Sequence, residues 1–510
     1  MLSQVKSMAL QGVQGHLITI QVDISSGLPS WDVVGLPDIS IKESKQRVKA
    51  ALKNIGYELP SRKIIINLAP ANIKKEGSLF DLPISLGILC DLNILDNSLF
   101  EDYFFIGELS LDGSLNKVSG VLPMCIEAYH KGIKKAIVPW ENRFEASVIK
   151  DLEIYPAYNL LDVINHFQNN IKLKQFESNI DDYFSSHHNY YSDFSDVKGQ
   201  EKVKRALEIS AAGGHNCLLI GSPGSGKTML ASRIPSILPD LTFNESLEIT
   251  KIHSITGIMP PDTPLITTRP FRSPHHTISY SAFVGGGKNP KPGEITLAHY
   301  GVLFLDEVPE FKKDILENLR EPLENRQIII NRVSSSLTYP CNFILVGAMN
   351  PCPCGYFGSN DKECSCTPDQ IKKYINKLSG PLLDRIDIHM EVSPVKYNDL
   401  YSERKVESSE EIKKRVNKAR SIQLERYKND SIFSNSELNS RLIKKYCKLD
   451  DESNSLLRKA FETLNLSARA HDKIIKLART IADLDNSKEI RSIHVAEAIT
   501  YRGLDRKYWK

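Results

Sequence analysis

Residues 217–228 read Cys-Leu-Leu-Ile-Gly-Ser-Pro-Gly-Ser-Gly-Lys-Thr, four apolar residues that run into a glycine-rich octapeptide. The apolar run predicts a buried strand, and the residues from about Met229 onward predict a helix. Glycines let backbone N–H groups converge on phosphate oxygens, and the helix N-terminus behind them adds its dipole. The pattern G-x-x-x-x-G-K-S/T in this setting therefore predicts a phosphate-binding loop in a parallel-sheet domain.

The residues of this loop have distinct expected roles. Lys227 would reach the β- and γ-phosphates of a nucleotide, and the Thr228 hydroxyl would ligate Mg²⁺. A glycine-rich turn formed by chance is the alternative, which the strand and helix on either side disfavour. The cofactor-binding residues expected from the loop are Gly221, Ser222, Pro223, Gly224, Ser225, Gly226, Lys227 and Thr228.

Two further strands end in polar side chains that suit such a site. Residues 301–307, Gly-Val-Leu-Phe-Leu-Asp-Glu, are a buried-strand run followed by two acids. Asp306 would hold Mg²⁺ through the coordination shell of the ion, and Glu307 would polarise the hydrolytic water. The alternative is that the two acids only cap the end of a strand. Asn350 follows the apolar run 343–349. An amide at the tip of a strand between the two nucleotide strands can orient water against the γ-phosphate.

These motifs resemble an AAA+ ATPase in order and spacing, together with Asp-Val-Lys-Gly-Gln at 196–200 and Leu-Leu-Asp-Arg-Ile-Asp at 382–387. The segments Arg-Pro-Phe-Arg-Ser-Pro-His-His at 269–276 and Ala-Arg-Thr-Ile-Ala-Asp-Leu at 478–484 resemble the magnesium-chelatase-like ComM/YifB family over essentially the whole chain. The two histidines of the first segment suit a packed or an interface position equally well.

The resemblance implies three further catalytic residues. Asn350 would be sensor 1, Arg385 the arginine finger that completes a neighbouring subunit's site, and Arg469, just after a Ser467 cap, sensor 2. A finger acting in trans implies a homo-oligomeric ring, expected to be a hexamer, and poor ATP hydrolysis by an isolated monomer. The alternative for Arg385 is a salt bridge to Asp384 or Asp387.

Four cysteines form a compact sequence cluster after Asn350: Cys352, Cys354, Cys364 and Cys366. Four thiolates in a short loop can form a closed, structural Zn²⁺ site, and reduced thiols in a loop are the alternative. A zinc ion there would stiffen the loop between Asn350 and Arg385. The other five cysteines are scattered singly, which is typical of buried reduced thiols.

Residues 107–120 and 132–139 resemble the proteolytic domain of Lon proteases. In the alignment that this resemblance gives, Leu79 stands at the serine nucleophile and Leu122 at the lysine base. Ser78 and Lys117 are close to these positions in sequence, but a shift of one residue turns a side chain away. The resemblance therefore implies a Lon-like fold without protease activity, with a role in substrate handling or assembly.

The expected architecture is multidomain α/β. Residues 1–170 would form the Lon-like α/β domain, 171–195 a linker, 196–395 the AAA+ parallel-sheet core with the cysteine cluster, and 396–510 a helical lid, the magnesium-chelatase carboxy-terminal domain. No apolar run approaches the 18 residues of a membrane span, and the first residues lack a signal-peptide core, so we expect a cytoplasmic protein with no membrane partner.

Charge neither demands nor excludes a nucleic-acid partner. The chain carries a formal net charge of +3, yet residues 401–510 hold 25 basic and 17 acidic residues against 40 and 45 in the remainder. The family resemblance implies that residues 285–291 are a mobile basic loop in the pore of the ring, and residues 328–332 resemble the pre-sensor hairpin of replicative MCM helicases. Basic residues on such loops could follow a phosphate backbone, and solvated turns are the alternative.

Three function classes follow from these observations. The resemblance implies a Mg-ATP-dependent DNA motor, a branch-migration helicase acting on single-stranded or branched DNA during natural transformation. A chelatase-type or protein-remodelling ATPase without DNA is the second class, and a Lon-like protease is the third.

Overall fold

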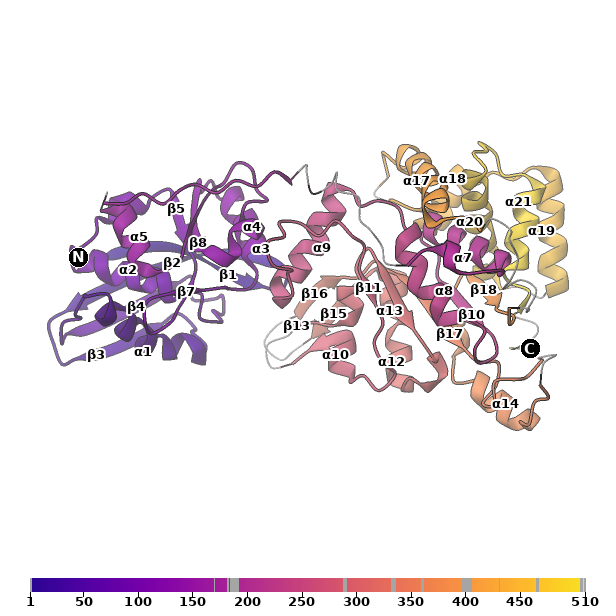
Figure 1. The fold of residues 1–510 in the computed structure, drawn as a ribbon, viewed down its shortest axis with the longest axis horizontal. Coiled ribbons are helices and arrows are strands. Elements are labelled where there is room, and N and C mark those ends of the chain that lie inside the picture. Colours follow the sequence, from indigo (N-terminus) through magenta and orange to yellow (C-terminus); the bar gives the residue numbers. More distant parts are fainter. Residues whose placement is uncertain are drawn as a thin grey trace. The chain divides into compact units, whose positions relative to one another are not determined.

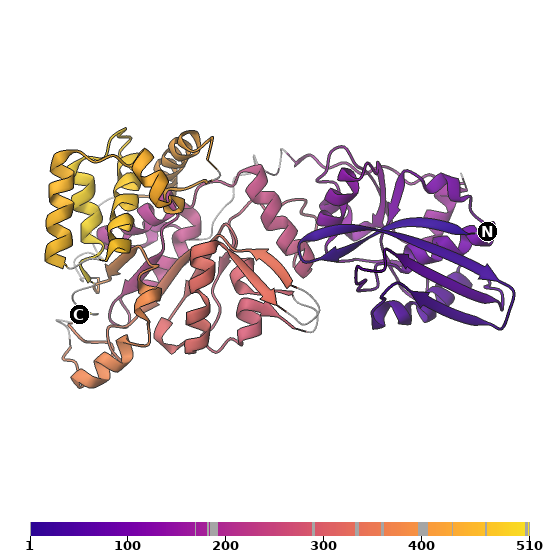
Figure 2. The same ribbon diagram turned by 180° about the vertical axis from the view of Figure 1, so that it is seen from behind.

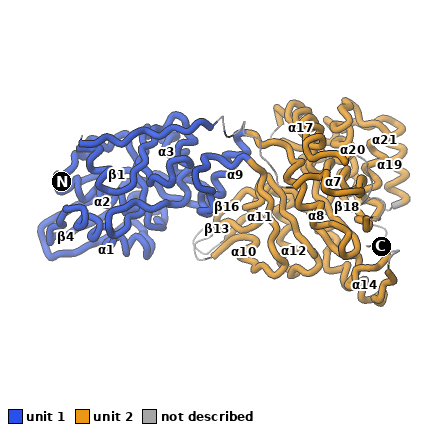
Figure 3. The backbone as a smooth tube through the Cα atoms, in the orientation of Figure 1, with its two compact units in different colours: residues 1–187, 243–267 blue, residues 188–242, 268–510 orange. Residues whose placement is uncertain are grey.

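The structure is a computed structural model that describes residues 2–168, 170–180, 183, 192–287, 291–331, 336–358, 362–395, 406–430, 432–464, 467–504 and 508. The chain divides into two compact units (Figure 3). The amino-terminal unit consists of residues 1–187 and 243–267, and the carboxy-terminal unit of residues 188–242 and 268–510.

The amino-terminal unit is built on two sheets. Its four-stranded sheet has the order β1-β2-β4-β3, in which β3 and β4 are parallel and the other pairs antiparallel (Figure 2). A three-stranded parallel sheet has the order β5-β8-β9. The elements are β1 (Ser3–Gln11), β2 (Gln14–Ser25), β3 (Ser30–Val34), α1 (Ile39–Asn54), β4 (Lys63–Ala69), α2 (Asp81–Asp91), β5 (Tyr103–Phe105), β6 (Glu108–Leu109), β7 (Leu115–Asn116), α3 (Val121–His130), β8 (Lys135–Pro139), α4 (Arg143–Ala146), β9 (Glu153–Ala157), α5 (Leu160–Phe167) and α9 (Phe243–Thr256).

Two segments belong to this unit although the sequence places them elsewhere. Residues 243–267, expected inside the nucleotide-binding core, include α9, which packs on α3. Residues 171–180, expected in the linker, return along β9, where the Phe176 N–H donates to the Ile154 carbonyl at 2.9 Å. Ile180 and Leu265 share a buried apolar cluster with Leu122. Apolar burial therefore attaches both segments to the unit.

The carboxy-terminal unit contains a five-stranded parallel sheet of order β11-β14-β17-β10-β18, followed by helices (Figure 1). The parallel-sheet core and the helical carboxy-terminal part are thus as the sequence predicts. Short apolar runs form the central strands because both faces of the sheet are covered by helices. The elements are α7 (Glu201–Gly213), β10 (Cys217–Ile220), α8 (Lys227–Arg233), β11 (Phe271–Arg272), α10 (Tyr280–Val284), β12 (Gly285–Gly286), β13 (Lys291–Pro292), α11 (Glu294–Leu297), β14 (Val302–Leu305), α12 (Lys313–Asn318), α13 (Arg320–Asn325), β15 (Gln327–Asn331), β16 (Ser336–Pro340), β17 (Ile344–Met349), α14 (Pro368–Ile375), α15 (Gly380–Leu383), β18 (Ile388–Glu391), α17 (Ser409–Arg426), α18 (Ser440–Tyr446), α19 (Asp451–Leu464), α20 (Ala468–Leu484) and α21 (Ser492–Thr500).

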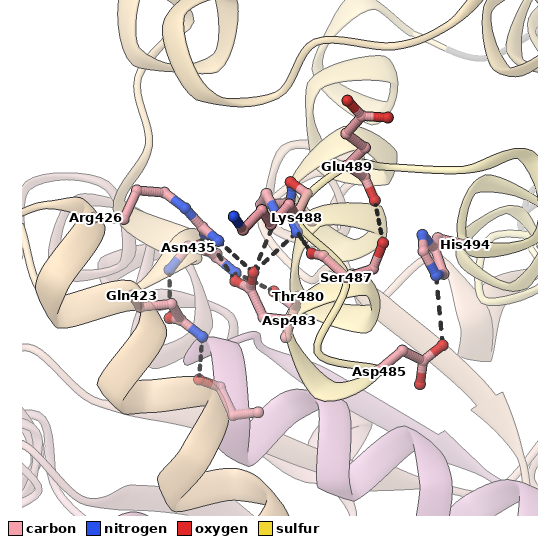
Figure 4. A network of polar contacts seen from close by, with 12 residues as sticks. Gln423, Arg426, Asn435, Thr480, Asp483, Asp485, Ser487, Lys488, Glu489 and His494 are labelled. Atoms are coloured by element: carbon pink, nitrogen blue, oxygen red, sulfur yellow. Dashed lines mark hydrogen bonds and ion pairs between the residues drawn. The ribbon is translucent and has the colours of Figure 1, made fainter.

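A buried polar network fastens the carboxy-terminal helices to each other and to α7 (Figure 4). Asp483 on α20 accepts hydrogen bonds from Arg426 on α17 at 2.8 Å and from Asn435 at 2.9 Å. Gln423 donates to the Ala212 carbonyl of α7 at 3.1 Å. Arg479, 2% exposed, pairs with Asp483 one turn along α20. Two charged residues of the segment 478–484 therefore serve packing, because buried charges need partners.

Five cysteines are buried free thiols, as expected: Cys90, Cys125, Cys217, Cys341 and Cys447. Among the described residues, none of the helices combines the length and the apolar character needed to cross a membrane.

Candidate nucleotide-binding site

The glycine loop lies between a buried strand and a helix start. All four residues of β10 are buried, and α8 begins at Lys227. Gly224 and Gly226 have φ angles of 77° and 87°, which lie in the left-handed region that favours glycine. At Gly221 an added Cβ would lie 2.3 Å from the Val392 carbonyl oxygen. The glycines thus allow both the sharp turn and the close approach of β18's end to the loop.

Lys227 lies at the centre of the predicted site. Its ammonium donates hydrogen bonds to the carbonyls of Gly221 at 2.8 Å and Ser222 at 2.9 Å, and to the Asn350 side-chain oxygen at 3.2 Å. Burial lowers the pKa of Lys227, while the nearby carboxylates of Asp306 and Glu307 oppose that shift. The ammonium is therefore held inside the loop, where a phosphate could exchange for the carbonyl oxygens.

The two expected Mg²⁺ ligands are in direct contact. The Thr228 hydroxyl, on the first turn of α8, donates to the Asp306 carboxylate at the end of β14 with an O···O distance of 2.7 Å. The strands explain this meeting, since β14 and β10 flank β17 and all three run parallel. Hydroxyl and carboxylate oxygens are the ligands that Mg²⁺ prefers, so the donor set fits this ion.

Glu307 has an unusual backbone and an exposed side chain. Its φ is 51°, in the left-handed region, and its side chain is 58% exposed. Such a conformation in a non-glycine residue is enriched at functional sites. The carboxylate lies 3.9 Å from Nδ1 of His276, the second histidine of the pair at 275–276. The sequence does not predict this contact, because the two residues are 31 positions apart and no local pattern joins them.

Asn350 follows β17, the strand between β14 and β10, as expected. Its side chain reaches Lys227, so the loop, the acids and the amide gather at the carboxyl edge of one sheet. Ligands bind at this edge in open parallel sheets.

Arg385 does not contact this cluster and has a partner other than those predicted. Its guanidinium pairs with Glu324, at the end of α13, and donates to the Pro381 carbonyl at 2.8 Å. The expected alternative pairings with Asp384 or Asp387 are wrong. Asp387 is buried and pairs instead with Lys473 at 3.0 Å. Backbone geometry separates the neighbours: the Arg385 and Asp387 side chains point to different partners although only Ile386 lies between them.

Arg469 lies on the first turn of α20 and is exposed. Ser467 caps this helix, as expected, by accepting a hydrogen bond from the Ala470 N–H. No hydrogen bond or ion pair joins Arg469 to the glycine loop within the described residues. Of the predicted catalytic residues, the structure thus brings Glu307 and Asn350 to the loop, but not Arg385 or Arg469.

The four clustered cysteines converge in space. Their sulfur atoms all lie within 4.8 Å of one another, and three pairs are 3.3–3.6 Å apart. A tetrahedral zinc site with Zn–S bonds of about 2.3 Å needs sulfur atoms about 3.8 Å apart. The Tyr356 N–H lowers the pKa of the Cys354 thiol to about 5. Desolvation and the Cys354 sulfur raise the pKa of the other three thiols. The fit to a metal therefore rests on the convergence of the four sulfur atoms.

The cysteine loop also touches the glycine loop. A Cβ added to Gly355, whose φ is 86°, would lie 2.5 Å from the Pro223 ring. The cysteine cluster thus packs directly against the segment expected to hold the phosphates, a proximity that no sequence motif predicted.

Each candidate pore loop includes part of an antiparallel strand pair: β12 pairs with β13, and β15 pairs with β16. Lys288 and Arg332 lie outside the described residues.

The amino-terminal unit does not bring the candidate protease residues together. Ser78 donates a hydrogen bond to Glu108, whereas Lys117 contacts the Met259 carbonyl at 3.4 Å. Leu79 and Leu122 are 7% and 0% exposed and belong to the apolar interior.

Comparison with known proteins covers nearly the whole chain. Residues 20–142 match the family model "Subunit ChlI of Mg-chelatase", 193–400 "Magnesium chelatase, subunit ChlI" and 406–502 "Magnesium chelatase, subunit ChlI C-terminal". The chain is 43% identical to Competence protein ComM of Haemophilus influenzae, covering 99% of this chain and 98% of that protein. It is 44% identical to the uncharacterized protein YifB of Escherichia coli, with the same coverage. A magnesium-chelatase 38 kDa subunit of Rhodobacter capsulatus is 26% identical over 41% of this chain and 61% of its own length. The chain therefore belongs to the magnesium-chelatase-like AAA+ family that includes ComM and YifB.

Proposed function

We propose that this protein is a Mg-ATP-dependent hexameric motor that acts on DNA as a branch-migration helicase during natural transformation or recombination. One observation carries the proposal: the cluster of Lys227, Thr228, Asp306 and Asn350 stands in a chain that matches Competence protein ComM along 99% of its length. The printed name of that relative supports a role in competence, and the cluster supports a role for ATP.

The chain's own residues divide the work of hydrolysis. The backbone N–H groups of residues 221–228 and the Lys227 ammonium would bind the phosphates, and Thr228 and Asp306 would hold Mg²⁺. The ion would supply charge neutralisation at the phosphates. Glu307, exposed beside the cluster, would accept a proton from water, and Asn350 would orient that water.

Arg385 supports assembly into a ring. Within one chain it pairs with Glu324 and lies outside the Lys227 cluster. The Arg385 side chain is 15% exposed and Glu324 55% exposed, so the guanidinium would reach a neighbouring subunit by exchanging Glu324 for the phosphates of that site. In a closed ring each subunit would then lend Arg385 to the next site. Arg469 would act as sensor 2 when nucleotide draws α20 toward the loop.

The proposal is tested on a synthetic four-way or forked DNA junction with ATP. The wild-type chain should move or unwind the branch, and DNA should stimulate its ATP hydrolysis with a steep salt dependence. Lys227→Ala should bind no ATP, because it removes the phosphate contact. Glu307→Gln should bind ATP but hydrolyse it about 100-fold or more slowly. Intact ATPase activity with no movement of the junction would overturn the motor proposal.

A chelatase-type or protein-remodelling ATPase without DNA is the second candidate. The family models that match are those of magnesium-chelatase subunits, which is the observation in its favour. ATP hydrolysis that no single-stranded, duplex or branched DNA changes would favour this candidate over the first.

We propose further that the cysteine cluster holds a structural Zn²⁺ and that the amino-terminal unit is not a protease. Four converging thiols support the first proposal. For the second, Ser78 pairs with Glu108 rather than with Lys117, so no base contacts a candidate nucleophile in that pair. Casein cleavage that is lost on changing Ser78 would overturn the second proposal.

A further inference from the structure

A basic groove on the amino-terminal unit has no part in the site described above. It is a cavity of about 320 Å³ beside α1, at the ends where β3 and β4 begin. Lys45, Lys49 and Lys53 of α1 line one side, and the residues before β4, including Glu58 and Arg62, line the other. All of these residues belong to the amino-terminal unit.

The charge of the groove is almost entirely positive. The three lysines are four residues apart, so their stems leave the same face of α1 at intervals of about 6 Å. Arg62 adds a fourth cation, and Glu58 is the one acid in the lining. None of the four cations forms an ion pair with a carboxylate of the described residues. Lys49 instead lies over the Trp31 ring, 5.8 Å from its centroid.

The ion pair that joins α1 to its unit comes from a different residue. Arg47, on another face of the same helix, makes the structural contact: its guanidinium donates to both Asp81 oxygens at 2.6 and 3.0 Å, and Asp81 is buried. Lysines at successive i,i+4 positions repel one another and cost an isolated helix about 0.2–0.5 kcal/mol per pair. A row of lysines that repel one another and form no ion pair within the described part of the chain points to an external anion.

The lining also indicates which kind of anion fits. Pro29, Leu59 and Ile64 add apolar surface beside the cations. A phosphodiester strand presents repeating charges joined by less polar sugars, and lysines on flexible stems follow such a strand as point charges without reading its sequence. A single strand, whose backbone bends easily, can follow this row of cations and turn its bases toward the apolar surface.

We propose that this groove binds the backbone of single-stranded nucleic acid, which gives the amino-terminal unit a binding role of its own. The choice of nucleic acid among polyanions rests on the proposed function. The groove would hold one strand, independently of ATP, through Lys45, Lys49, Lys53 and Arg62.

The test uses the full-length chain and a fluorescent oligothymidylate, with binding measured by anisotropy over a series of salt concentrations. In the triple variant Lys45→Glu, Lys49→Glu, Lys53→Glu, affinity should fall by about 10-fold or more at low salt. The slope of log affinity against log salt should become shallower by about 2, because three phosphate contacts of about 0.7 each are lost. A milder variant with glutamine at the same three positions should show the same slope change and guards against misfolding.

The matched control changes three lysines of the same unit that do not line the groove: Lys134→Glu, Lys172→Glu and Lys174→Glu. It alters the net charge equally and should keep the wild-type slope. Equal losses in both triple variants, or no loss in the groove variants, would overturn the proposal. So would polyglutamate that displaces the strand from the wild-type chain more effectively than inorganic polyphosphate does.

The outcome separates this inference from the proposed function. Wild-type binding that the groove variants retain would refute the groove alone. Binding that the groove variants lose, in a chain whose ATPase ignores DNA and whose junction assay is negative, would refute the motor alone. A wild-type chain that binds no strand refutes the groove, and it refutes the motor as well only if the junction assay is also negative.

Discussion

Asp387 is a buried carboxylate two residues beyond Arg385. It accepts a hydrogen bond from the Asn216 N–H at 3.0 Å and lies 3.0 Å from the Lys473 ammonium and 3.6 Å from His215 Nδ1. Burial alone would raise the pKa of Asp387, but Lys473 and His215 hold it far below its ordinary value. The segment that carries Arg385 is thus fixed to the residues that follow α7 and to α20 by an ionised side chain.

Asp387→Asn should therefore lower the free energy of unfolding at pH 7 by about 3–5 kcal/mol, because it leaves Lys473 buried without a countercharge. A carboxylate whose pKa is depressed on folding contributes stability above its unfolded pKa of about 4 and loses it as the pH falls further. The free energy of unfolding of the variant should therefore fall less than that of the wild type as the pH is lowered through this range. Denaturant unfolding over a pH series measures both effects. Asp384→Asn, at a neighbouring position with no ion pair in the described part of the chain, is the control, and equal losses in the two variants would contradict the prediction.

Gly355 carries the contact between the cysteine loop and the glycine loop. Gly355→Ala should weaken ATP binding several-fold, because its Cβ would displace the Pro223 ring, 2.5 Å away. Nucleotide titration by fluorescence or calorimetry measures the change. Gly56→Ala, at a φ of 93° with nothing within 4 Å, controls for the left-handed backbone. An unchanged ATP affinity in Gly355→Ala would show that Pro223 can move freely.

The cysteine cluster is a property of a whole loop, because four side chains must meet. The purified chain should hold about one zinc per molecule, and cobalt in its place should give the absorption of thiolate coordination. Cys364→Ser combined with Cys366→Ser should abolish metal retention and lower the melting temperature. Metal analysis and thermal unfolding check this, with the buried Cys341→Ser as control. A reduced wild-type chain that never retains zinc would leave only thiols in the loop.

At the scale of elements, the expected strands and helices follow from period and composition. The apolar runs at 217–220 and 302–305 form buried strands, and the apolar repeats at 456–464 and 474–484 lie within α19 and α20. These patterns identify a buried face but not its partner. Residues 243–267 show the limit: the sequence patterns predict no helix there, and the packing of α9 on α3 depends on apolar surface supplied by distant residues.

At the scale of the molecule, a ring would share each catalytic site between two chains. Lys227→Ala and Arg385→Ala should each reduce ATP hydrolysis by about 1,000-fold or more, since the first loses nucleotide and the second its finger. Mixed rings should recover activity, because about a quarter of the interfaces in an equal mixture join an intact loop to an intact Arg385. ATPase assays on co-assembled variants measure this. No recovery in verified mixed assemblies would place the function of Arg385 within its own chain.

The sequence by itself determined the glycine loop, the strand that ends in Asp306 and Glu307, the position of Asn350 and the helical carboxy-terminal part, because each depends on residues close together along the chain. Only the tertiary structure decided that Thr228 contacts Asp306 across 78 positions, that Arg385 pairs with Glu324, and that Gly355 contacts Pro223. The same holds for the basic groove. The sequence shows three lysines at intervals of four residues, but only the structure shows that they form no ion pair within the described residues. Local patterns fix which surfaces are apolar or charged, and packing selects which of those surfaces meet.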